Sequence, residues 1–242
     1  TGIMAGASLM FFGFLGFESI SMTVDEIKEP QKNVPRGIVL ALIIVASLYA
    51  VVSLVLTGVV HYTKLNVDDA VAYALRYIGV SWAANYVSVV AIMTLITVCI
   101  SMAYALSRMV YSLARDGFLP QTFQKVSKTH KVPHYATLLT GILSAISSGI
   151  FSLANMASLV NISTLAYLVL LAIALIILRK DKGLPQKDEF KVPFVPVLPI
   201  LSIIVCLSFM SQYSWQTWSA FGIAVLIGSA IYAFYGYKHS KY

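Results

Sequence analysis

The sequence predicts an all-α integral membrane protein with seven transmembrane helices. Of its residues, 59% are hydrophobic and 11% are charged, whereas soluble domains are typically about 25% charged. The charged residues also leave four long uncharged runs, and about 20 residues of helix are enough to cross a bilayer. These runs cover residues 37–60, 82–107, 134–178 and 192–237.

Each helix follows from one of these runs or from the apolar opening of the chain. The last two runs are long enough for two crossings each, with a fold-back near Asn155 and another across Gln212 to Trp218. We therefore expect helices over about residues 3–24, 37–60, 82–114, 134–154, 156–178, 194–212 and 215–237.

The connections between these helices carry most of the polar residues. Residues 25–37 contain two prolines and mixed charge, which is typical of a solvated turn. Between residues 61 and 81, apolar residues recur at helical spacing, which predicts a short amphipathic helix at the membrane face. The helix that starts at Trp82 should run past the hydrocarbon and stop at Gly117.

The basic residues are sorted to one side of this arrangement. With the N-terminus outside, all of the 17 lysines and arginines except Lys64 and Arg76 fall on the inner side. Because basic loops stay in the cytoplasm, we expect the C-terminus to be cytoplasmic. The net charge of +7 then reflects topology and contact with membrane lipid, and no nucleic acid partner is expected.

Several classes of chemistry lack their usual residues. The four histidines are scattered without the spacing of metal ligands, so no metal site is expected. No paired nucleophile and base occurs, and no phosphate-binding GxxxxGK[ST] loop is present. We therefore expect no cofactor, and neither an enzyme nor an ATP-driven pump on this chain.

The segment "FFGFLGFESI", residues 11–20, is unusual for a membrane helix because it contains Gly13, Gly16 and then Glu18. Glycines weaken a helix, and a broken helix exposes backbone groups that lipid tolerates only beside protein or a watery cavity. Such breaks form substrate sites in many secondary transporters. The alternative is that Gly13 and Gly16 only let another helix approach closely.

Glu18 and two groups of polar residues leave similar alternatives open. An intramembrane carboxylate usually marks an ion or substrate pathway, but Glu18 could instead lie in water near the inner end. Hydroxyls at helical spacing, with Met102 beside them, could bind a ligand or return to their own helix. These hydroxyls belong to Thr94, Thr97 and Ser101, and the same alternatives apply to Asn161, Ser163 and Thr164.

Four stretches together resemble the second half of an amino acid permease of the APC (amino acid, polyamine and organocation) superfamily, and bacterial cationic amino acid transporter homologues in particular. They are "FFGFLGFES", "DEIKEPQKNVPRG", "SRMVYSLARDGFLPQTFQKV" and "KVPHYATLL". The resemblance runs over nearly the whole chain. It implies a fold of two inverted five-helix repeats plus two further helices, of which this chain would hold helices six to twelve.

The resemblance also implies a division of the chain and a site. Residues 1–178 would be the second repeat and residues 179–242 the two additional helices with a short tail. The substrate would lie against the unwound part of the sixth helix, with Glu18 at a proton-sensing position. The implied substrate-binding residues are Phe11, Phe12, Gly13, Phe14, Leu15, Gly16, Phe17, Ser101 and Met102.

We therefore expect a fragment of a secondary transporter that moves amino acids across a bacterial plasma membrane by proton symport or exchange. Thr1 opens almost directly into a hydrophobic run, so a fragment is expected. The resemblance implies that the first five helices are missing and that they are the partner that completes the site. The rival reading is a non-transporting seven-helix membrane protein, either receptor-like or a scaffolding subunit. A retinal protein is excluded, because no lysine occurs from residue 192 to 237.

Overall fold

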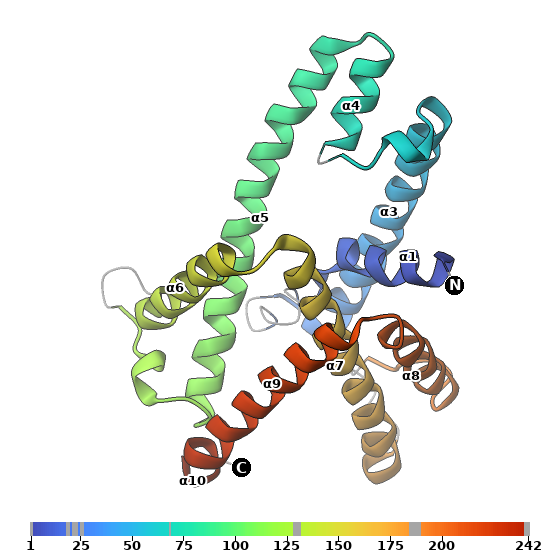
Figure 1. Ribbon diagram of the computed structural model, residues 1–242. Helices are drawn as coiled ribbons and strands as arrows, with labels where there is room; N and C mark the ends of the chain where they lie inside the picture. Colours follow the sequence, from blue (N-terminus) through green and yellow to red (C-terminus); the bar gives the residue numbers. More distant parts are fainter. Residues whose placement is uncertain are drawn as a thin grey trace.

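The structure is a computed structural model that describes residues 2–17, 20, 24, 27–67, 69–127, 132–183 and 190–239. These residues form helices, turns and loops and include no strand, which confirms the all-α class. Figure 1 shows the helices α1 (Gly2–Met10), α3 (Pro30–Val59), α4 (Ala70–Tyr77), α5 (Ser81–Arg115), α6 (His134–Ile150), α7 (Leu153–Lys182), α8 (Val197–Met210), α9 (Trp215–Ile231) and α10 (Tyr237–His239). Short 3-10 turns lie at Phe11–Phe14, Tyr62–Lys64 and Gln121–Gln124, and a π-helical turn at Tyr232–Gly236 joins α9 to α10.

Four helices in the described ranges are long and apolar enough to cross a membrane, which makes the chain a multi-pass membrane protein. They span Pro30–Val59, Ser81–Arg115, Leu153–Asp181 and Trp215–His239. The other expected crossings correspond to shorter helices, because Gly2–Phe14 contains a break, α6 has 17 residues and α8 has 14 residues. A count of seven crossings would require these shorter segments to cross as well.

Local signals in the sequence set the helix ends. The side chains of Asp69, Ser152 and Ser214 cap the N-termini of α4, α7 and α9, each by accepting a backbone N–H. At its C-terminus, α5 ends at Arg115, and Gly117 follows with a φ of +91°. The sequence predicted that this helix stops at Gly117. Because of the Ser152 cap, α7 begins earlier than the expected fold-back near Asn155, and it continues past residue 178.

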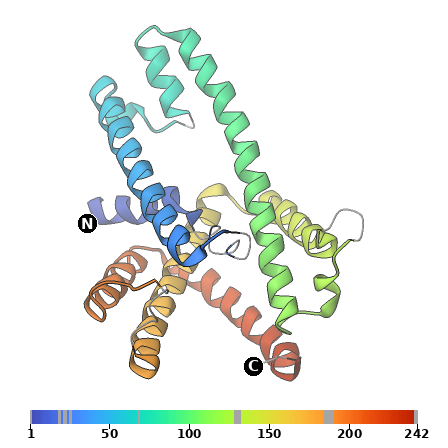
Figure 2. The same ribbon diagram turned by 180° about the vertical axis from the view of Figure 1, so that it is seen from behind.

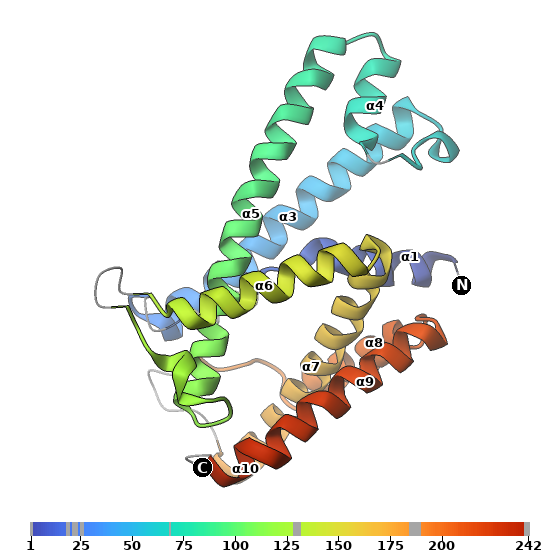
Figure 3. The same cartoon turned by 60° about the vertical axis from the view of Figure 1, so that its left-hand side comes forward.

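The helices form two regions that differ in packing. We call α3, α4 and α5 the arms, and α1, α7 and α8 the packed group. In the packed group, Ile162 and Leu165 of α7 form a buried cluster with Cys206 and Met210 of α8. Figure 2 shows α4 and the upper parts of α3 and α5 at the top, with α7 and α8 at the lower left, and Figure 3 shows α6 and α1 crossing between α4 and the pair α8 and α9.

Candidate functional site: a broken helix

The opening helix breaks at the segment that the sequence singled out. α-Helical geometry ends at Met10, a 3-10 turn covers Phe11–Phe14, and Leu15 is extended with φ −62° and ψ 147°. Gly16 follows with a φ of +120°, and helical geometry resumes at Phe17. A side chain rarely adopts such a φ, so glycine at this position permits the break. The alternative in which both glycines serve only close helix approach is therefore excluded for Gly16.

Gly13 allows α3 to touch the break. The Tyr49 hydroxyl of α3 donates a hydrogen bond of 2.9 Å to the carbonyl oxygen of Gly13. A Cβ atom on residue 13 would lie 3.2 Å from Cε2 of the Tyr49 ring, which is tighter than ordinary contact. The same ring meets Phe14 edge to face with centroids 5.5 Å apart. Gly13 thus combines close approach with the capping of an exposed carbonyl group.

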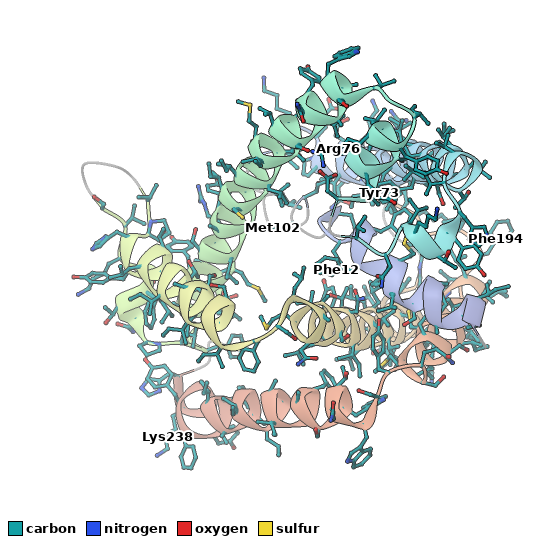
Figure 4. All side chains as sticks on the ribbon, turned by 45° about the horizontal axis from the view of Figure 1, so that its top comes forward. Phe12, Tyr73, Arg76, Met102, Phe194 and Lys238 are labelled. Carbon is teal, nitrogen blue, oxygen red and sulfur yellow. The ribbon has the colours of Figure 1, made fainter. Side chains whose placement is uncertain are left out.

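Gly16 faces α5. A Cβ atom on residue 16 would lie 3.4 Å from Cε of Met102, which places the Met102 side chain against the break. Figure 4 shows Phe12 and Met102 on facing sides of the space between the break and α5. Phe12 is 43% exposed and Met102 is 41% exposed, so both retain surface that a ligand could cover. The structure thus brings Gly16 and Met102, two residues that the sequence placed at the site, into contact.

On its other side, the broken helix is held by hydrogen bonds to the carbonyl oxygen of Ser8, a residue of α1. This atom accepts hydrogen bonds from the Tyr213 hydroxyl at 3.0 Å and from Nδ2 of Asn161 at 3.4 Å. The Ser8 hydroxyl in turn donates to the carbonyl oxygen of Phe209 at 3.3 Å. Ser8 and Asn161 are both fully buried. These contacts satisfy polar groups at the end of α1, where a helix lacks its own partners.

The predicted site residues point in two directions. Phe11 packs against the buried cluster of α7 and α8. Phe12 and Gly13 are exposed, whereas Phe14, Leu15, Gly16 and Phe17 are half-buried. Phe11 therefore anchors the break to the packed group, while Phe12 is available on the open side.

The polar stripe on α5 bonds to its own helix. Thr94, Thr97 and Ser101 donate to the carbonyl oxygens of Val90, Met93 and Thr97 at 2.8, 3.0 and 3.0 Å. Ser163 of α7 does the same toward Leu159 at 2.7 Å. Asn161 instead joins two helices. Ser101 uses its proton within α5, so it would meet a ligand as an acceptor.

Glu18 lies outside the described residues. The side chains placed at the break, Phe12, Phe14, Tyr49 and Met102, are uncharged, and the polar groups there are mainly backbone groups. Within the residues described, no cluster of three His, Cys, Asp or Glu side chains could hold a metal ion. The arrangement can therefore bind a small molecule through backbone hydrogen bonds and apolar contacts.

A family model described as amino acid permease matches residues 1–231 of the chain. This chain belongs to the amino acid permease family. The APC resemblance inferred from "FFGFLGFES" and the three other stretches is thereby confirmed. The family consists of membrane transporters and not of enzymes, in agreement with the absence of catalytic motifs.

Relatives of this permease chain differ in the cargo that their names give. The chain is 44% identical over 239 residues to the methylthioribose transporter of Bacillus subtilis (strain 168), covering 99% of this chain and 52% of that protein. It is 38% identical over 242 residues to the branched-chain amino acid permease BcaP of the same strain, again 99% and 52%. The vacuolar cationic amino acid transporter 2 of Arabidopsis thaliana is 33% identical over 178 residues, covering 74% and 28%. The permease chain thus spans about half the length of the bacterial relatives.

Sequence reasoning missed two residues at the break, Tyr49 and Tyr213. Tyr49 is the one aromatic residue in the uncharged run 37–60, and a phenol hydroxyl in a membrane helix needs an acceptor. That residue type is a signal that could have marked it. Tyr213 lies in a polar turn between two expected helices, and nothing local distinguishes it from its neighbours.

Proposed function

We propose that this chain forms the second half of a secondary amino acid transporter in a bacterial plasma membrane. Its seven helical segments would be helices six to twelve, with residues 1–178 as the second repeat and the C-terminus in the cytoplasm. The observation that carries the proposal is the break at Phe11–Gly16, with a φ of +120° at Gly16. A discontinuous membrane helix is the usual site for substrate binding in alternating-access transporters.

In this proposal, the break forms one wall of the substrate site. Backbone groups of residues 11–17 would bind the α-amino and α-carboxyl groups of an amino acid, and Phe12 and Met102 would contact its side chain. Ser101 would face the cargo from α5, and Phe11 would hold the break in place. The other wall would come from the first five helices. The described side chains at the break, Phe12, Phe14, Tyr49 and Met102, are uncharged, which supports cargo with an uncharged side chain.

A chimera tests this function directly. Residues 1–242 would replace the matching portion of the B. subtilis methylthioribose transporter, whose first half would supply the other wall. We expect vesicles containing the chimera to take up radiolabelled leucine or isoleucine faster than lysine, and uptake to exceed that of empty vesicles. Residues 1–242 reconstituted alone should give no uptake, because they hold only one wall.

The controls separate the possible outcomes. The unaltered B. subtilis transporter reports whether the vesicles are sealed and energised. A chimera that reaches the membrane but transports neither its parent's cargo nor any amino acid would favour the non-transporting alternative. Uptake by residues 1–242 alone would contradict the half-site proposal. A proton ionophore distinguishes the coupling modes, because it abolishes accumulation by symport and spares exchange.

We further propose that Glu18 takes up and releases a proton during transport, as its intramembrane position suggests. A Glu18→Gln chimera should lose the rise in uptake at acidic external pH, while Glu29→Gln in the following loop should keep it. The measurement is initial uptake rate between pH 5 and pH 8. An unchanged pH profile in Glu18→Gln would refute the coupling role and leave the substrate site intact as a proposal.

A further inference from the structure

A second site lies on the packed group, away from the break. An apolar groove of about 510 Å³ runs between α7 and α8. Its walls include Leu168, Leu171 and Leu175 of α7, and Leu201 and Val205 of α8. Leu171 and Leu201 are 46% and 55% exposed, so the groove is open along the described part of the chain. An open apolar groove on a membrane helix pair is shaped for a hydrocarbon chain.

The groove ends at a basic residue. Its lining positions on α7 follow helical spacing, at residues 168, 171, 172 and 175, and the next position on this stripe is Arg179. The Arg179 guanidinium reaches the segment that precedes α8, where Nη2 donates to the carbonyl oxygen of Val192 at 3.5 Å. Val192 itself lines the groove. Arg179 therefore lies at the mouth of the groove, about 16 Å along α7 from Leu168 at 1.5 Å per residue.

Arg179 lacks a counter-charge in the described part of the chain. Its Nη1 atom is buried and has no hydrogen-bond partner there. The ion pairs found among the described residues, Lys32 with Glu29 and Arg115 with Asp116, do not involve it. Leaving the N–H groups of a buried guanidinium nitrogen such as Nη1 without an acceptor is costly. The geometry calls for an oxygen-rich anion at the groove mouth.

Basic residues outnumber acidic residues around the mouth, by five to three over residues 179–191 of the sequence. Lys180 on α7 and Lys191 before α8 are exposed, and Asp181 is the one acidic residue described in this part of α7. Arginine and lysine at the end of an apolar membrane run mark the depth of the lipid headgroups. A phosphate at that depth with an acyl chain in the groove would satisfy both features together.

We propose that the α7–α8 groove binds one anionic phospholipid, with an acyl chain along Leu168–Leu175 and the phosphate on Arg179. Guanidinium binds phosphate through two parallel N–H···O bonds, which distinguishes Arg179 from the neighbouring lysines. A neutral lipid would leave the net positive charge of the mouth uncompensated. An apolar protein helix would fill the groove but would leave Nη1 of Arg179 without an acceptor.

The test uses the purified 242-residue chain in nanodiscs that contain equal amounts of phosphatidylglycerol and phosphatidylcholine. Lipid that stays bound on release from the nanodisc is identified by native mass spectrometry. We expect the chain to retain phosphatidylglycerol in preference. Arg179→Gln should lower that preference by at least about tenfold, because a hydrogen bond to a charged group is lost.

Matched variants keep the test decisive. Lys180→Gln removes the same charge one residue away and should lower the preference by less than about threefold, since Lys180 is exposed. Arg179→Lys should be intermediate, because it keeps the charge and loses the paired donors. Leu201→Trp should fill the groove and release the lipid with Arg179 intact.

Three outcomes would overturn the proposal. One is equal retention of phosphatidylglycerol by the wild-type chain and Arg179→Gln. Another is equal retention of both lipids by the wild type, which would mean that the groove selects only the hydrocarbon. The third is displacement of the lipid by inorganic phosphate, which would assign Arg179 to a free anion. None of these measurements depends on transport, so they are independent of the function proposed above.

Discussion

The arms and the packed group have similar apolar sequences and opposite surroundings. In the most apolar part of α3, 0% of the residues are buried, compared with 22% in α7. The packed group holds the buried cluster and the hydrogen bonds to Ser8, whereas α3 touches the rest of the described chain mainly at Tyr49 and α4. Hydrophobicity alone therefore tells which segments enter the membrane, and it does not tell what they face once there.

The difference is instructive because membrane helices gain little from burying one apolar side chain against another instead of against lipid. Association depends on close packing and on hydrogen bonds between helices. The packed group has both. Ile162 is closely packed in the buried cluster, and Asn161 and Tyr213 each donate a hydrogen bond to the carbonyl oxygen of Ser8. The arms carry bulky side chains that point outward, as lipid or further helices of the same transporter would require.

The largest effect is expected from Ile162→Ala. Ile162 is fully buried, so its truncation leaves a cavity and should lower the free energy of unfolding by about 2–5 kcal/mol. Leu54→Ala on α3 is the matched control. Leu54 is 73% exposed, and its truncation should cost less than about 0.5 kcal/mol. Denaturation in mixed detergent micelles measures both, and equal losses would show that the two regions do not differ as described.

A smaller effect is expected at Gly16, where the two regions meet. Gly16→Ala places a side chain at a φ of +120° and should cost about 1–3 kcal/mol, together with most of the chimera's uptake. Gly6 lies on α1 with open space around it, so Gly6→Ala should leave the free energy of unfolding unchanged or raise it slightly. Uptake rate normalised to membrane expression compares the two. Full uptake in Gly16→Ala would mean that the break can form without glycine.

The smallest effect is expected for Tyr49→Phe, which removes the one described hydrogen bond between α3 and the break. Interhelical hydrogen bonds in membranes average about 0.6 kcal/mol, so the loss of stability should be of that order. Tyr86→Phe on α5 is the control, since Tyr86 is 67% exposed. The same denaturation experiment reports both variants. A loss above about 2 kcal/mol for Tyr49→Phe would mean that α3 is held much more firmly than its exposure suggests.

The sequence predicted local features well, because they depend on residues close together along the chain. The short helix α4 follows from its apolar spacing and the end of α5 from Gly117, whereas Gly13 and Gly16 marked the break only as one of two alternatives until the family resemblance favoured it. The partners of the freed carbonyl groups could not be predicted in this way. Tyr213 and Asn161 reach Ser8 across 205 and 153 residues of sequence, and such contacts depend on how whole helices pack. For the same reason, the role of Phe11 as a packing residue emerged only from the structure.

The acceptor that unites α1 with α7 and the turn after α8 is a backbone atom, the carbonyl oxygen of Ser8. Every amino acid has a backbone carbonyl group. A substitution at Ser8 therefore removes the hydroxyl group and leaves this acceptor atom in the chain. The two hydrogen bonds to this carbonyl oxygen can be removed at their donors, at positions 161 and 213. The side chains that hold the end of α1 through this carbonyl group therefore belong to residues far from α1 in the sequence.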